Sequence, residues 1–146
     1  MKSLLEEDGY NDIKKRLANL SEDSKKQWGK MTHGQMLRHC QFPLNISIEN
    51  KEHRAKFNPI IWLFKSSLYN DRPWRKGLPT AKALKITDER DFHKEREILD
   101  GLIDRFYELK DRTHWNRHPL FGEFTKEQWG QMQYKHLDHH LTQFGE

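Results

Sequence analysis

Three histidines, His136, His139 and His140, stand within five positions in the segment YKHLDHH. Imidazoles bind transition metals and exchange protons near neutral pH, so the cluster raises the question of a metal site. His136 and His140 are four residues apart, the spacing at which two imidazoles on one helix can bind the same ion. The alternative is a pair of core histidines satisfied by carbonyls or water, which is harder to achieve because both rings need polar partners.

A helix that begins after Thr125 positions this pair. At about 100° per residue, His136, His140 and Gln143 fall in one narrow sector of such a helix, and His139 falls near its edge. The histidine pair therefore occupies a stripe that we expect to face the core. His139 and Gln143 are expected to surround the pair rather than to belong to it.

A third ligand must come from another helix, and His39 is our candidate. It follows the expected helix start at Thr32 by seven residues, roughly 10 Å along the axis. If the last helix ends near Phe144, the midpoint of His136 and His140 lies about 9 Å from that end. An antiparallel pairing of the two helices brings all three rings to one level. The sequence thus predicts that the nitrogens of His39, His136 and His140 converge.

Two similar stretches, WGKMTHGQM (28–36) and FGEFTKEQW (121–129), fix the starts of these two helices. Each contains T-x-x-Q, the pattern of a capping box. In this motif the threonine hydroxyl accepts a hydrogen bond from the glutamine backbone amide, and the glutamine side chain accepts one from the threonine backbone amide. Met31 and Phe124 precede the caps as expected hydrophobic staples.

The remaining helix-forming segments complete an all-α domain over residues 1–146. We expect a first helix around 6–19, a third beginning near Thr87, and a short helix within 58–70 capped by Asn58, followed by a loop over 70–80. Pro43 cannot donate to the carbonyl of His39, so the second helix is expected to kink or end there.

Other residues with chemical potential receive lesser roles. His118 is expected at the lip of the site, because Pro119 and Gly122 indicate a loop, and Cys40 as a small buried apolar residue. Trp62 and Trp74 could line a pocket. Four histidines are expected at the surface: His33, His53, His93 and His114.

Charge and composition limit the partners. Residues 51–85 carry nine basic and two acidic side chains, so this segment has a net charge of +7 within a chain of net charge +4. That distribution favours a small anionic partner or a solvated basic surface. Nucleic acid is an unlikely partner, because no reading helix or aromatic RNA motif is present. No apolar run could span a membrane, and one cysteine with no secretory signal favours the cytoplasm.

WGKMTHGQMLRHC and HPLFGEFTKEQWGQMQYKHLDHHLTQFG resemble motifs of the DinB-like (DinB/YfiT) superfamily, in a branch of unknown function. The resemblance implies a four-helix bundle of up-down-down-up order with long crossovers. It also implies metal ligands at the positions of His39, His136 and His140. Superfamily members often continue after the last histidine with Arg-Gly-Gln, whereas here Leu-Thr-Gln follows and only Gln143 matches.

The superfamily also suggests an activity. Its members include divalent-metal thiol transferases, which use bacillithiol, mycothiol or glutathione, and some hydrolases and isomerases. We therefore expect a zinc or nickel enzyme that activates a low-molecular-weight thiol, with His139, Gln143 and His118 around the ion. A metal-dependent hydrolase and a non-catalytic metal- or ligand-binding bundle remain alternatives, as does assembly into a homodimer.

Overall fold

The structure is a computed structural model that describes residues 1–54, 58–78 and 84–146. Lys56 and Lys82 of the basic segment lie outside this part. The described chain is all-helical, and its only β-type pairing is an isolated bridge between His118 and Gly122. Its helices are α1 (Glu7–Asn19), α2 (His33–Glu49), α3 (Pro59–Lys65), α4 (Phe92–Tyr107) and α5 (Lys126–Gln143), with 3-10 turns η1 (Ser66–Leu68) and η3 (Glu108–Asp111).

Both predicted capping boxes are present. The Thr32 hydroxyl accepts from the Gln35 amide at the start of α2, and the Gln35 side chain accepts from the Thr32 amide. Thr125 and Gln128 form the same reciprocal pair at α5. Phe124 packs edge-on against Trp129, which completes the hydrophobic staple at this end. These local interactions set the rotation of the two histidine-bearing helices.

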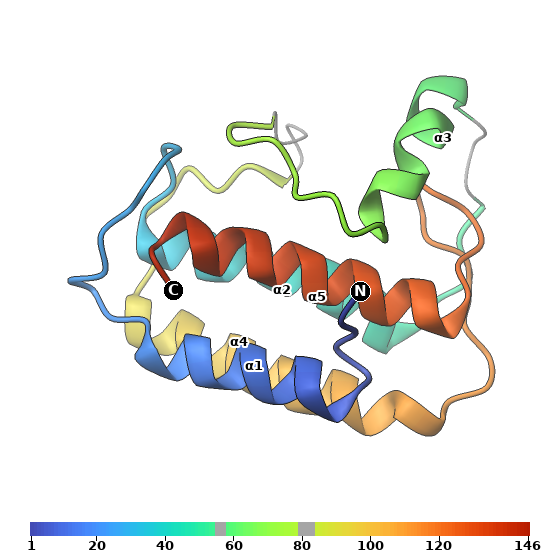
Figure 1. The fold of residues 1–146 in the computed structure, drawn as a ribbon, viewed down its shortest axis with the longest axis horizontal. Helices are drawn as coiled ribbons and strands as arrows, with labels where there is room; N and C mark the ends of the chain where they lie inside the picture. The colour runs from blue at the N-terminus through green and yellow to red at the C-terminus, as the bar shows by residue number, and fades with distance from the viewer. Residues whose placement is uncertain (55–57, 79–83) are drawn as a thin grey trace.

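The four long helices lie alongside one another, with α1 and α5 running in one direction and α2 and α4 in the other (Figure 1). Packing contacts join α2 to α4, α1 to α5, α2 to α5 and α1 to α4. Burying each large apolar side chain between them contributes roughly 1.5–3 kcal/mol. Fully buried examples are Ile13, Leu17, Met36, Leu37, Leu44, Leu99, Ile103, Phe106 and Trp129.

One predicted boundary is wrong. α4 begins at Phe92 rather than near Thr87, because the side chain of Asp91 accepts a hydrogen bond from the Lys94 amide and caps the helix there. Of the two outcomes expected at Pro43, a kink or an end, the end does not occur, because α2 continues to Glu49. The Pro43 carbonyl accepts a hydrogen bond from Gln133 Nε2 on α5, and packing against α4 supports the helix beyond it.

The short helix α3 is capped by Asn58 as predicted, but its apolar side chains are largely exposed, including Trp62 at 61%. None of the helices described here is long and apolar enough to cross a bilayer.

Candidate metal centre

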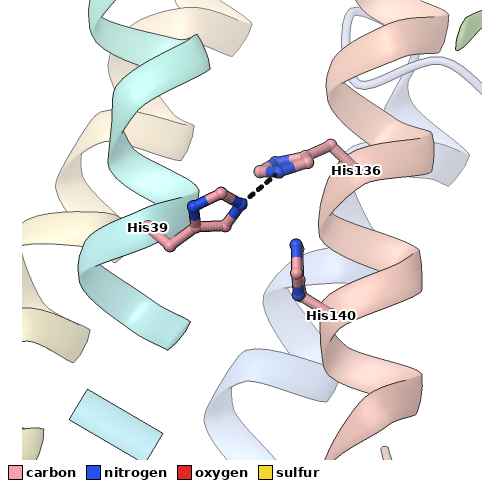
Figure 2. Close-up of side chains that lie close together, drawn as sticks. All are labelled: His39, His136 and His140. Atoms are coloured by element: carbon pink, nitrogen blue, oxygen red, sulfur yellow. Dashed lines mark hydrogen bonds between the residues drawn. The ribbon is translucent and has the colours of Figure 1, made fainter. Parts of the chain in front are cut away.

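His39 on α2 faces His136 and His140 on α5, and the three rings point toward one another (Figure 2). All three side chains are buried, with 7–8% of their surface exposed. One nitrogen from each ring lies within 4.8 Å of the others, and the His39 and His136 Nε2 atoms are 3.1 Å apart. The predicted convergence of the three rings is confirmed.

The outer nitrogen of His140 is fixed by a relay of hydrogen bonds. Gln143 Nε2 donates to the Trp28 carbonyl at 2.9 Å, which orients the amide so that Oε1 faces His140 Nδ1, also at 2.9 Å. An amide oxygen can only accept, so Nδ1 carries the proton. The Nε2 lone pair of His140 is therefore left for the cluster, the arrangement typical of metal-bound histidines whose second nitrogen contacts protein.

His39 has the same tautomer for a similar reason. Its Nδ1 lies 3.4 Å from the Leu84 carbonyl, an acceptor, so that nitrogen is the donor. The contact is long, but it directs the proton away from the cluster. His39 Nε2 then presents a lone pair toward His136.

His136 lacks such a partner. Its Nδ1 is buried without a hydrogen bond to the described chain, while its Nε2 faces His39. Two nitrogens on a tetrahedral zinc ion lie about 3.3 Å apart when each Zn–N distance is ~2.0–2.1 Å. The 3.1 Å separation of His39 and His136 is close to that value, and all three nitrogens lie within 4.8 Å of one another. The chemistry of the donor set fits a divalent ion, and His39, His136 and His140 are the residues that would hold it.

Burial keeps all three rings neutral at physiological pH. It lowers the pKa of His136 well below the usual value, and the neighbouring His140 and His39 rings lower it further. Burial, with a smaller contribution from His39, lowers the pKa of His140 to about 3. The pKa of His39 is also lowered by burial, against the opposing effect of the Leu84 carbonyl. Neutral imidazole is the form that binds a metal.

His139 is half-buried beside the cluster, and its ring contacts those of Trp28, Trp74 and His140. A cavity of about 530 Å³, here called the histidine cavity, opens next to it. The residues that line it include Trp28, Lys30, Lys85, His139, His140 and Gln143. Lys30 and Lys85 therefore place positive charge in the same cavity as the candidate metal ligand His140.

The chain matches the model of a protein family. A model of the family "Protein of unknown function (DUF1569)" matches residues 2–146. The chain belongs to the DUF1569 family. No curated protein and no solved structure matches it. The family description assigns no activity, so a function has to be inferred from the residues of the site.

His118 does not join the cluster. It is buried against Phe124 and Trp129, and Trp129 precedes His136 on α5 by roughly 10 Å. The Nδ1 atom of His118 accepts hydrogen bonds from the amides of Leu120 and Phe121. The expectation that it forms the lip of the site is wrong, because the turn it caps is folded onto the aromatic core.

Some of the remaining predictions are confirmed and others are wrong. His93 and His114 are exposed as predicted, but His33 is half-buried against Phe144 and its Nε2 lies 2.7 Å from the Ser24 carbonyl. Cys40 is buried beside Met36, and burial raises the pKa of its thiol, so it is a packing residue and no nucleophile at neutral pH.

Sequence reasoning missed the backbone groups that orient the ligands. Gly29 has φ of +85°, and a Cβ there would lie 2.2 Å from Gln143 Nε2. The glycine of the WG pair therefore lets the Trp28 carbonyl approach Gln143. The repeated aromatic-Gly pattern was a signal for this turn, whereas nothing in the sequence marks the Leu84 carbonyl.

Proposed function

We propose that this DUF1569 chain is a divalent-metal-dependent enzyme, with zinc or nickel held by His39, His136 and His140, that transfers a group to a low-molecular-weight thiol. The observation that carries the proposal is the tautomer pattern. Two rings have their outer nitrogens hydrogen-bonded to protein acceptors and their inner nitrogens directed at a third buried ring. His136 and His39 also share a hydrogen bond, but the fixed outer nitrogens of His39 and His140 leave their inner nitrogens directed at the cluster, as in metal-bound histidines.

The proposal includes membership of the DinB-like superfamily, with the up-down-down-up order of a four-helix bundle. The opposite directions of α1 and α5 relative to α2 and α4 support it (Figure 1), as do ligand positions on one middle helix and the last. The three histidines come from a single chain, so the site does not require a homodimer. A reducing cytoplasm would keep the thiol substrate available.

Three neutral imidazoles leave the full charge of a divalent ion and at least one open position, which is the composition of a catalytic rather than a structural site. When bound, the ion supplies positive charge that favours the deprotonated form of a nearby thiol or water. In the transfer reaction, sulfur forms a bond to an electrophilic carbon, the leaving group departs with the bonding pair, and the thiol proton passes to solvent.

The chain's own residues supply binding and orientation. Lys30 and Lys85 are exposed on the wall of the histidine cavity, where their ammonium groups can bind the carboxylates of a thiol such as glutathione. Gln143 holds His140 in one tautomer. Cys40 is buried, so the sulfur that reacts must be that of the substrate.

The test begins with elemental analysis of untagged protein purified without added metal. We expect about one zinc or nickel ion per chain, lost in His39→Ala and His136→Ala and retained in the exposed-histidine control His93→Ala. The cobalt-substituted protein should then change its visible spectrum on addition of glutathione or bacillithiol.

If the wild-type protein binds no metal even after incubation with zinc and nickel, His39, His136 and His140 are core histidines rather than ligands. A bound ion with a spectrum indifferent to every thiol would instead favour the metal-dependent hydrolase, which uses the same ligands.

A further inference from the structure

A second cavity, of about 330 Å³, lies on the other side of His139. We call it the tryptophan cavity, because Trp28 and Trp74 both line it. The cavity is also lined by Arg72, Lys76, Lys135 and His139. Trp28 and His139 also line the histidine cavity, so the two cavities share a wall.

The Trp74 wall is held rigidly. Its indole Nε1 donates to the Ser67 carbonyl at 2.8 Å, and the Lys135 ammonium donates to the same oxygen at 2.7 Å. Lys135 also binds the backbone and side-chain oxygens of Asn70. Lys135 is only 6% exposed, so a buried charge is used to fasten the 67–70 turn to α5. Because burying a charged ammonium group carries a desolvation penalty, this arrangement indicates that the position of the Trp74 ring is important.

These hydrogen bonds place the Trp74 ring next to the candidate ligand His136 and its neighbour His139. Its centroid lies 5.6 Å from that of His139 and 6.0 Å from that of His136. A flat molecule bound between Trp28 and Trp74 would therefore contact the ring that backs His140. Aromatic walls favour planar partners through stacking and through burial of apolar area.

The mouth of the tryptophan cavity is positive. Lys76 Nζ lies 4.6 Å from the centroid of the Trp28 ring, and both Lys76 and Arg72 are exposed without a carboxylate partner in the described chain. The two acids of the lining are engaged, since Asp71 pairs with the Met1 amino group and Asp138 with Arg16. An anionic group on the ligand would meet these free cations.

We propose that the tryptophan cavity binds a planar organic anion. Resting on the proposed function, that anion is the electrophilic second substrate, held across the shared wall from the thiol in the histidine cavity. Two cavities that meet at His139 and Trp28 match the need of a transferase to bring two small molecules together.

The test uses 8-anilinonaphthalene-1-sulfonate, an anion with a planar naphthalene ring, titrated into the full chain and followed by calorimetry. We expect one site, weakened about tenfold by Trp74→Leu and several-fold by Lys76→Glu. Trp62→Leu, which removes an exposed tryptophan outside the cavity, is the matched control and should bind as wild type. The uncharged analogue N-phenyl-1-naphthylamine should bind more weakly.

Circular dichroism and metal content check that the Trp74→Leu protein is folded, and Lys76→Glu tests the same cavity with an exposed substitution. Unchanged binding in both variants, or loss of binding in Trp62→Leu, would overturn the cavity assignment while leaving the metal site intact. Retained dye binding in a chain that takes up no metal would sustain the cavity and overturn the proposed enzyme.

Discussion

At the N-terminal end of α5, the His118 ring lies among Phe121, Phe124 and Trp129, whereas farther along the same helix His136 and His140 face His39. Burial is the main cause of a lowered pKa in both places, to about 4 for His118 and to about 3 for His140. Depressed basicity therefore does not distinguish the two environments.

The hydrogen bonds do distinguish them. His118 Nδ1 is saturated by the amides of its own loop, which makes the ring a rigid fastener for the turn before α5. In the trio the outer nitrogens of His39 and His140 are hydrogen-bonded to protein, and the Nε2 atoms of His39 and His136 face each other at 3.1 Å. The comparison teaches that the direction of unused lone pairs, rather than burial, identifies a candidate ligand set.

Metal addition should separate the two regions most strongly. At a zinc concentration of 100 times Kd, we expect the free energy of unfolding to rise by about 2.7 kcal/mol, since only the folded chain presents the trio. His136→Asn should abolish this gain and His118→Asn should keep it. Urea denaturation with zinc and with chelator measures both. Equal gains in the two variants would break the distinction.

Acid should affect the two regions alike in metal-free protein. An unfolded histidine titrates near pH 6.5, and the folded rings titrate lower, so below that pH the unfolded chain binds more protons. Stability should fall as the pH falls, by about 1.4 kcal/mol per pH unit for each buried histidine, and these rings should contribute nothing above pH 6.5 to 7.

Either His118→Asn or His140→Asn should reduce that slope by one histidine's share between pH 6 and pH 4.5. Urea titrations at several pH values in chelator provide the measurement. A slope unchanged by His140→Asn would mean that its ring is solvated and charged.

Two of the positive-φ glycines, one near each region, sharpen the comparison at the level of ligand orientation. Gly29 and Gly122 have φ of +85° and +72°, but an added Cβ meets Gln143 only at Gly29. Both alanine variants should lose stability from backbone strain. Gly29→Ala alone should weaken zinc affinity by about 10–100-fold, because it disturbs the partner of His140. Competition with a chromogenic chelator measures this, and equal affinities would show that the relay through Gln143 is dispensable.

The smallest effects should come from the paired caps. Thr32→Ala and Thr125→Ala each remove one capping hydrogen bond and should cost about 1 kcal/mol of stability without altering metal content. Chemical denaturation and elemental analysis of the two variants suffice. Metal loss in Thr32→Ala would mean that the start of α2 controls the position of His39.

The capping boxes explain why much of this was accessible from sequence. Once Thr32 and Thr125 fixed the helix starts, helical geometry alone brought His39 level with His136 and His140. Gln143 was also identified, because it is one turn from His140. Sequence reasoning left an alternative open, or was wrong, where a nonlocal contact decides. α2 continues past Pro43 and packs on α4, and His118 turns inward because Phe124 and Trp129 surround its ring.

The Trp28 and Leu84 carbonyls could not have been found in this way. They are main-chain atoms of loops without periodicity, and their role depends on where α2 and α5 leave them.

The contact between His39 and His136 joins residues 97 positions apart. An ion that bridged them would close a loop containing the basic segment and all of α4. Only the folded chain holds the two histidines together, so the binding free energy of the ion would add to the folding free energy of the whole domain. Release of the ion would then also lower the stability of α1 and α4, although neither helix contributes a ligand.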